Sequence, residues 1–212
     1  MRFHDRTDAG RQLAERLRGR ALVDPVVLAL PRGGVPVAFE VAKVLAAPLD
    51  VFVARKVGAP GQKELGVGAI AEGSDDVVAS EVAQLLDIDD RRLRELADQE
   101  RPELDRRVAL YRDGPLVDVA GRDVIVVDDG LATGVTAEAA LRALRQRRPS
   151  SLVLAVPVAA PDVAERLKTI ADDVVCILFP RDFRAVGLWY DTFGQTSDRE
   201  VNELLACARG LV

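Results

Sequence analysis

One segment of this chain, Val124 to Ala140, constrains its fold more than any other. Four consecutive β-branched residues, VIVV, run directly into Asp128 and Asp129, and the stretch GLATGVT separates these acids from a segment with helical spacing. This order predicts a buried strand, a tight loop and a helix. It therefore places two carboxyl groups and several backbone amides at the carboxyl end of a strand, which is where open α/β sheets bind their ligands.

Short apolar runs alternate with longer amphipathic segments along most of the chain, a pattern typical of a parallel sheet covered by helices. The 212 residues, 49% of them hydrophobic, are enough to form the core of one domain. We therefore predict a single-domain α/β protein with a mostly parallel twisted sheet flanked by helices. Its predicted strands are Val26 to Leu30, Leu49 to Ala54, Val124 to Val127, Leu152 to Val156 and Val174 to Leu178, and its predicted helices are Asp8 to Arg18, Val35 to Leu45, Ala137 to Arg147 and Pro161 to Ala171.

The middle of the chain departs from this alternation. Val67 to Ala71 and Asp76 to Ala79 have the length and spacing of a small hairpin. Asp89 to Arg112 is dense in charge, with leucines at rough helical spacing and Pro102 among them. Because proline lacks a backbone donor and clashes with the preceding turn, this segment is predicted as two helical pieces or as one kinked helix.

Composition argues against several classes of function. A formal net charge of -5 and a pI of about 5.1 disfavour a general nucleic-acid-binding surface, which is normally basic. Cys176 and Cys207 lack the spacing of a disulfide framework or a zinc site. No apolar run approaches the roughly 18 residues of a membrane span, and the start of the chain does not resemble a signal peptide. We expect a cytoplasmic protein without nucleic-acid or membrane partners.

The loop after the two acids has the chemistry of a phosphate site. A helix that begins near Thr136 offers unpaired amides and the positive end of its dipole, and Gly130 and Gly134 allow an anion to approach the backbone closely. A Walker A loop would need a lysine where Val135 stands. The paired acids of a receiver domain would follow a strand near the chain start, and an ordinary polar turn rarely needs two adjacent aspartates at a buried strand end.

The sequence DDGLATGVT resembles the signature of type I phosphoribosyltransferases, which bind phosphoribosyl pyrophosphate (PRPP). The resemblance implies that family's fold, with a core at about residues 20–178 and a small flexible hood formed by residues 179–212 and the N-terminal segment. It also implies that Asp128 and Asp129 bind the ribose hydroxyls. The residues expected to cradle the 5′-phosphate are Gly130, Leu131, Ala132, Thr133, Gly134, Val135 and Thr136.

A second strand-loop-helix segment, Leu30 to Val35, offers Arg32, Gly33 and Gly34 to another phosphate group. Its place before Arg55 and Lys56 resembles the pyrophosphate loop of the same family. All five residues are therefore candidates for binding pyrophosphate. Lys56 is also a candidate catalytic residue, because a cation there would stabilise the leaving group.

The acceptor side is marked by aromatic residues, since five of the chain's nine fall between Phe179 and Phe193. This stretch resembles the hood of the hypoxanthine-guanine branch, which makes Phe183 and Val186 candidates for binding the acceptor and Asp191 a candidate metal ligand. The purine-reading lysine of that branch has no counterpart between Val156 and Ala160. The acceptor therefore stays open among purines, pyrimidines and other compounds.

The predicted function is Mg²⁺-dependent transfer of the phosphoribosyl group of PRPP to a nitrogenous base or related acceptor, with release of pyrophosphate. The alternative is a PRPP-binding regulator with little or no transferase activity. A sugar-phosphate hydrolase ranks last, because no nucleophile stands beside a base. Two segments, Gly58 to Gly66 and Asp89 to Arg112, are candidates for the mobile loop that closes over the substrate, and a homodimer is a further expectation.

Overall fold

The computed structural model describes residues 2–210, and its centre is a five-stranded sheet in the order β2-β1-β6-β7-β8. Every pair of neighbouring strands is parallel. β1 and β6 are buried along their whole length, which explains the continuous apolar runs in their sequences. The predicted parallel α/β sheet is confirmed. Its strands are β1 (Val26–Ala29), β2 (Leu49–Val51), β6 (Asp123–Val127), β7 (Ser151–Val158) and β8 (Asp173–Leu178).

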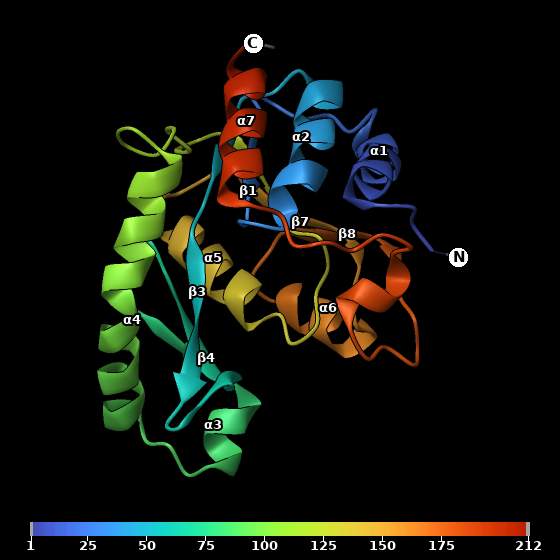
Figure 1. Ribbon diagram of the computed structural model, residues 1–212. Helices are drawn as coiled ribbons and strands as arrows, with labels where there is room; N and C mark the ends of the chain where they lie inside the picture. The colour runs from blue at the N-terminus through green and yellow to red at the C-terminus, as the bar shows by residue number, and fades with distance from the viewer. Residues whose placement is uncertain (1, 211–212) are drawn as a thin grey trace.

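Helices cover both faces of this sheet (Figure 1). On one face lie α1 (Arg6–Leu17), α2 (Gly34–Leu45) and α7 (Asp198–Arg209), and on the other lie α5 (Val135–Gln146) and α6 (Pro161–Leu167). Alternate residues of β1 point to opposite faces, as the period of a strand requires. Val27 and Ala29 therefore join the core beneath α1 and α2, whereas Val26 and Leu28 join the core beneath α5 and α6.

The strand order reverses between β1 and β6. The chain runs outward from β1 to β2 in one direction and from β6 through β7 to β8 in the other. In open α/β sheets the crevice for a ligand forms at such a switch point, beyond the carboxyl ends of the strands. Here the two neighbouring strands lead into the Leu30 to Gly33 loop and into Asp128 and Asp129, so the tertiary structure brings together both loops that were predicted to bind phosphate groups.

A second, antiparallel sheet contains β3 (Ala54–Ala59), β4 (Gln62–Ala71) and β5 (Val77–Ala79). The predicted hairpin is confirmed, because β4 pairs with β5 through partners such as Ile70 and Val77. The predicted single strand from Leu49 to Ala54 instead divides into the whole of β2 and the first residue of β3, with Phe52 and Val53 between them. Arg55 and Lys56 therefore lie within an antiparallel strand and do not stand at the carboxyl end of a parallel one.

A buried carboxylate explains why that strand divides. The Glu72 side chain accepts a hydrogen bond of 2.8 Å from the Val53 amide, and the Glu72 amide donates one of 2.9 Å to the Val53 carbonyl. Glu72 also forms an ion pair with Arg112, whose guanidinium donates to the Val51 carbonyl at 2.9 Å. The Phe52 amide still donates to the Ala29 carbonyl of β1, so these bonds turn the chain after Phe52 away from the parallel sheet and into the antiparallel one.

The charged segment in the middle of the chain is one long helix, α4 (Asp90–Tyr111), which includes Pro102. It follows the short helix α3 (Glu81–Leu85) and lies along β3 and β4 (Figure 1). Leu93, Leu96 and Leu104 are buried against this second sheet. The alternatives drawn from the sequence were two helical pieces or one kinked helix, and the segment forms one helix.

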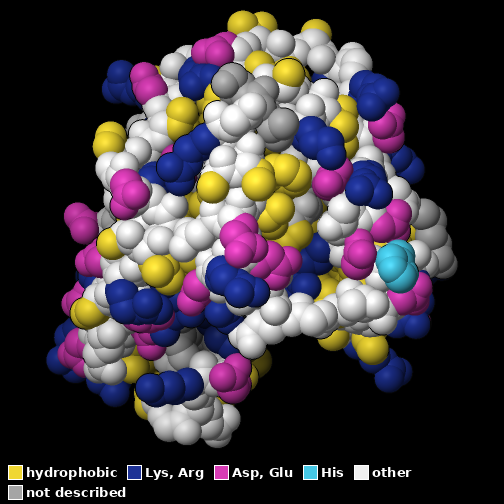
Figure 2. Space-filling view, turned by 45° about the horizontal axis from the view of Figure 1, so that its top comes forward, with side chains coloured by type: hydrophobic (Ala, Val, Ile, Leu, Met, Phe, Trp, Pro, Cys, Tyr) yellow, Lys and Arg dark blue, Asp and Glu magenta, His cyan; other side chains and the backbone are white. Residues whose placement is uncertain are grey.

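The hood includes a short 3₁₀ helix, η1 (Val186–Trp189), and the N-terminal segment lies beside it. Backbone hydrogen bonds join Phe3 to Trp189 and Asp191, and the Phe3 ring lies 5.4 Å from that of Tyr190. α7 was not predicted, although its Val201 and Leu205 enter the main core. Basic and acidic side chains are interspersed on the face shown in Figure 2. Among residues 2–210, no helix has the length and apolar character needed to cross a membrane.

Candidate active site

The two acids lie directly after β6, at the switch point of the parallel sheet. The Asp129 amide donates a hydrogen bond of 2.8 Å to the Asp128 carboxylate, so the backbone orients the first acid. Burial, and then the charge of Asp129, raises the pKa of Asp128 well above its usual value. Burial also raises the pKa of Asp129, against the opposing effect of Arg6. The pair concentrates hydrogen-bond acceptors that suit the hydroxyl groups of a sugar.

The predicted phosphate loop leads from the acids to α5. Gly134 precedes the helix with a φ of 68°, a left-handed conformation that favours glycine. Within the described part of the chain, the six amides from Ala132 to Ala137 donate no hydrogen bond. Thr133 is exposed, whereas Val135 is buried. Consecutive free amides at a helix N-terminus form an anion-binding arrangement, so the structure has the local geometry that the sequence predicted for this loop.

The two loops at the switch point touch through glycine. A Cβ atom on Gly33 would lie 2.0 Å from Oδ2 of Asp129, and one on Gly34 would lie 2.6 Å from the carbonyl oxygen of Val127. No side chain fits at either position unless the neighbouring atoms move. The glycines predicted to bind pyrophosphate therefore have a second role, because they allow the Leu30 to Gly33 loop to pack against the acidic pair.

Arg32 reaches from the same loop toward the start of α7. Its Nη1 lies 3.6 Å from the Asp198 carboxylate, which also accepts a hydrogen bond from the Tyr111 hydroxyl. Burial, followed by the bond to Asp198, raises the pKa of Tyr111 to about 12. Arg32 is 27% exposed, so its guanidinium remains accessible to a ligand.

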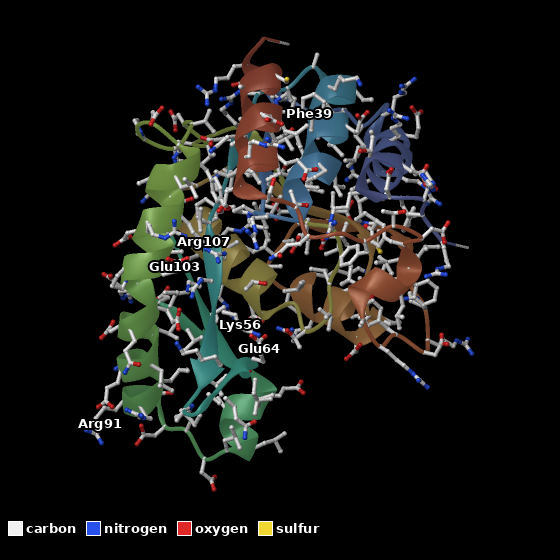
Figure 3. The ribbon with its side chains drawn as sticks, viewed as in Figure 1. Phe39, Lys56, Glu64, Arg91, Glu103 and Arg107 are labelled. Atoms are coloured by element: carbon white, nitrogen blue, oxygen red, sulfur yellow. The ribbon has the colours of Figure 1, made fainter. Side chains whose placement is uncertain are left out.

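Arg55 and Lys56 are engaged elsewhere. Nε of Arg55 lies 2.5 Å from the Glu100 carboxylate on α4. Nζ of Lys56 donates to the Glu64 carbonyl at 2.8 Å and lies 3.6 Å from its carboxylate (Figure 3). Among the described residues, neither cation forms a hydrogen bond or an ion pair with the two acids of the site. Their predicted roles in binding pyrophosphate, and that of Lys56 in catalysis, remain predictions.

The hood places both predicted acceptor residues near the phosphate loop. Val186 packs so closely on Gly130 that a Cβ atom on this glycine would lie 2.6 Å from a methyl group of the valine. Phe183 lines a cavity of about 560 Å³ together with Ala132 and Thr133 of the loop. The cavity therefore joins the hood to the loop that was predicted to hold a phosphate.

Asp191, the predicted metal ligand, has a side chain that is 55% exposed and lies 3.7 Å from Nε of Arg2. Its amide donates a hydrogen bond to the Phe3 carbonyl. No group of three His, Cys, Asp or Glu side chains within residues 2–210 has an arrangement suited to a metal ion. The assignment of Asp191 remains a prediction.

Two residues of the site were not predicted from the sequence. Nε of Arg6, at the start of α1, donates a hydrogen bond of 2.8 Å to Oδ2 of Asp129, and the buried Tyr190 hydroxyl donates one of 2.6 Å to the Asp129 carbonyl. Burial raises the pKa of Tyr190. These contacts span 123 and 61 residues along the chain. No local motif signals them, although Tyr190 belongs to the aromatic cluster noted in the sequence.

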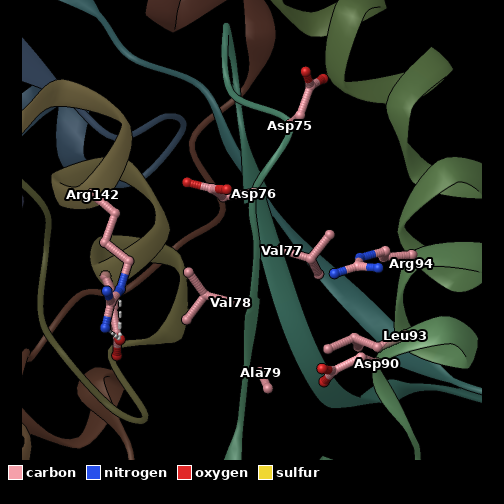
Figure 4. A pocket seen from close by; sticks show the side chains of 10 residues that line it. Asp75, Asp76, Val77, Val78, Ala79, Asp90, Leu93, Arg94 and Arg142 are labelled. Atoms are coloured by element: carbon pink, nitrogen blue, oxygen red, sulfur yellow. Dashed lines mark hydrogen bonds and ion pairs between the residues drawn. The ribbon is translucent and has the colours of Figure 1, made fainter. Parts of the chain in front are cut away.

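A further cavity of about 570 Å³ lies between β5, α4 and α5. Asp76, Asp90, Arg94 and Arg142 are among the side chains that line it (Figure 4). It contains none of the residues predicted to bind PRPP or an acceptor, so it is not part of the site described above.

Comparison with known proteins agrees with this arrangement. The family model of the phosphoribosyl transferase domain matches residues 3–191. The crystal structure of TT1426 from Thermus thermophilus has a TM-score of 0.81 and 47% identity, and the match covers 97% of this chain and 98% of that one. A protein of Mycobacterium tuberculosis, provisionally named a phosphoribosyl transferase, is 48% identical over 200 residues, which is 94% of this chain.

This chain spans about half the length of that mycobacterial relative, since the match covers 45% of it. A uracil phosphoribosyltransferase of Clostridium beijerinckii is 47% identical in an alignment of 78 residues, and the match covers 32% of this chain. The family match extends over both loops of the switch point and over the hood as far as Asp191. The chain belongs to the phosphoribosyl transferase domain family.

Proposed function

We propose that this chain is a Mg²⁺-dependent pentosyltransferase, which moves the phosphoribosyl group of PRPP to a nitrogenous base or related acceptor and releases pyrophosphate. One observation carries the proposal. Asp128 and Asp129 lie between the free amides of the phosphate loop and the loop that contains Arg32 and Gly33. A ribose on the two acids would have its 5′-phosphate on one side and its pyrophosphate on the other.

The proposed reaction exchanges one bond at the anomeric carbon. The bond from this carbon to pyrophosphate breaks, and pyrophosphate leaves with the electron pair. The carbon passes through a state with oxocarbenium character, and a nitrogen of the acceptor attacks it and then loses its proton. The chain's own groups would contribute by position and charge. The free loop amides are assigned to the 5′-phosphate, the two acids to the hydroxyls, and the partly exposed Arg32 to the leaving group.

Magnesium enters the proposal through the substrate. In phosphate-binding sites Mg²⁺ usually keeps several waters and is bound by one or two carboxylates together with substrate phosphates. Asp191 has an exposed carboxylate, which lies 3.7 Å from Nε of Arg2, and it is the residue we assign to the ion. When bound, the ion would neutralise part of the charge on the departing pyrophosphate.

The acceptor is assigned to the hood side of the phosphate loop, beside Phe183 and Val186. An aromatic ring at the edge of a cavity that also contains polar groups suits a planar base. The partial similarity to a uracil phosphoribosyltransferase supports including uracil among the candidates. A role in nucleotide metabolism follows from this assignment.

The test begins with calorimetric titration of PRPP in the presence of Mg²⁺. Pyrophosphate release is then measured with orotate, uracil, adenine and xanthine as acceptors. Release with one of these bases, dependent on both PRPP and Mg²⁺, is the expected result. Tight binding of PRPP without release from any base would support the PRPP-binding regulator instead.

The site itself is tested with the double variant Asp128→Asn, Asp129→Asn. Each amide keeps nearly the volume of the carboxylate and removes its charge, so the fold should persist while PRPP binding is lost. Circular dichroism supplies the control for folding. Wild-type affinity in the double variant would show that the acids do not bind the sugar.

A further inference from the structure

Arg6 is held at three points inside the candidate site. Its Nε donates a hydrogen bond of 2.8 Å to Oδ2 of Asp129, and its Nη1 donates one of 2.6 Å to the Gly194 carbonyl. The guanidinium carbon lies 3.9 Å from the centre of the Phe193 ring, in a cation–π contact. The side chains of Arg6 and Asp129 are only 13% and 15% exposed. A surface ion pair would not be fixed from so many sides.

The ion pair leaves half of the Asp129 carboxylate available. Oδ2 meets Arg6 and lies against Gly33, whereas Oδ1 has no hydrogen-bond partner among the described residues. A carboxylate has about four acceptor positions. Arg6 can therefore set the orientation of the group without occupying the oxygen that a ribose hydroxyl would use.

The rest of Asp129 is fixed as well. The Tyr190 hydroxyl donates to its carbonyl, and its amide donates to Asp128. The side-chain torsion is the remaining freedom of this residue, and the bond from Arg6 restricts it. Because an adjacent buried acid repels the Asp129 carboxylate, a cation at this position also offsets charge that the site must hold together.

We propose that Arg6 is a positioning residue of the donor site, the part of the candidate site assigned to PRPP. Arg6 holds the Asp129 carboxylate in the orientation where Oδ1 accepts a ribose hydroxyl of PRPP. The inference rests on the proposed function. Arg6 acts through Asp129 and does not bind the pyrophosphate, because its Nε and Nη1 are engaged by the acid and by the hood. This division of roles separates the proposal from that of a general anion-binding arginine.

The prediction concerns which ligands are affected. Arg6→Gln removes the charge and the two guanidinium donors that bind Asp129 and Gly194, but it keeps a polar side chain. Titration calorimetry with Mg²⁺ is carried out for PRPP, ribose 5-phosphate and pyrophosphate. Dissociation constants for PRPP and ribose 5-phosphate should rise about tenfold, the effect typical of losing a charged hydrogen bond. The constant for pyrophosphate should stay within about twofold, because pyrophosphate carries no ribose.

Arg16→Gln is the matched control, since Arg16 lies on the same helix, is exposed, and forms no ion pair within residues 2–210. All three ligands should bind this variant as they bind the wild-type protein. Unchanged ribose 5-phosphate binding in Arg6→Gln would overturn the proposal, and so would an equal loss of pyrophosphate binding. If the wild-type protein binds neither PRPP nor ribose 5-phosphate, the proposed function fails instead.

Arg6→Lys decides the matter if Arg6→Gln does not fold. Lysine keeps the charge and the cation–π contact but cannot reproduce the paired donors of the guanidinium. Weaker binding of ribose 5-phosphate, with pyrophosphate binding retained, would again support positioning through Asp129. Wild-type affinity for both ligands, or equal losses for both, would overturn it.

Discussion

Gly33→Ala should separate the two loops of the donor site. The backbone at Gly33 has a φ of −61°, which alanine adopts freely, so the effect must come from the added methyl group. That group would lie 2.0 Å from Oδ2 of Asp129, whereas ordinary van der Waals contact begins at 3.4 Å. Either the carboxylate or the loop must therefore move by about 1.4 Å, the difference between these distances, and the 2.8 Å bond from Arg6 is disrupted.

The expected loss follows from that disruption. A hydrogen bond to a charged group contributes about 1.5–3 kcal/mol, so the PRPP dissociation constant should rise about tenfold to a hundredfold. Overpacking should also cost about 1–3 kcal/mol of stability, or roughly 2–7 °C in Tm for a chain of 212 residues. Titration calorimetry and thermal melts measure the two effects.

Gly210→Ala provides the matched control. Gly210 has a φ of −90°, and its added Cβ would lie 3.5 Å from the nearest heavy atom in the described residues. Binding and Tm should both stay at the wild-type values in this variant. A dissociation constant for Gly33→Ala within about twofold of wild type would refute the reasoning that the loops depend on this close contact.

Three further predictions concern buried groups. Burial raises the pKa of Asp128 in the folded protein, so the stability contributed by its protonated form is lost as the pH rises through the folded pKa. Asp128→Asn cannot ionise and should therefore raise Tm at neutral pH but not near pH 4, which is about the unfolded pKa. An equal gain in Tm at both pH values would contradict this reasoning. Glu72→Ala leaves Arg112, whose side chain is only 10% exposed, without its partner and should lower the free energy of unfolding in urea by about 3–5 kcal/mol. A loss under about 1 kcal/mol would contradict the role of the ion pair. Burial raises the pKa of the Cys176 thiol to about 12, so iodoacetamide at about pH 8 should modify only the exposed Cys207. Mass spectrometry measures the labelling, and rapid modification of both thiols would refute this prediction.

The middle of the chain shows where local patterns are insufficient. The apolar run from Leu49 to Ala54 has the composition of one strand, yet the structure divides it between two sheets. The cause is Glu72, which binds both backbone groups of Val53 from a position nineteen residues farther along the chain. Hydrophobic periodicity reports burial, and Val51, Phe52 and Val53 at the centre of this run are all buried. It does not report which neighbouring strand supplies the hydrogen bonds.

The hood shows a related limit. The aromatic cluster was visible in the sequence, and it predicted a cover over a pocket. Its composition could not indicate that the Tyr190 hydroxyl binds the main chain of Asp129 or that Phe193 stacks on Arg6. Those contacts depend on how the N-terminal segment lies against residues 189–192.

The sequence by itself determined the parallel α/β sheet and the phosphate loop with its two acids. These features are local: VIVVDDGLATGVT contains the strand, the carboxylates and the amides in one continuous segment, so its geometry follows from backbone rules alone. Only the tertiary structure decided that Arg6, Gly33 and Tyr190 meet at Asp129, and that Lys56 pairs with Glu64. Contacts between distant segments depend on how whole elements pack, which no short pattern in a chain specifies.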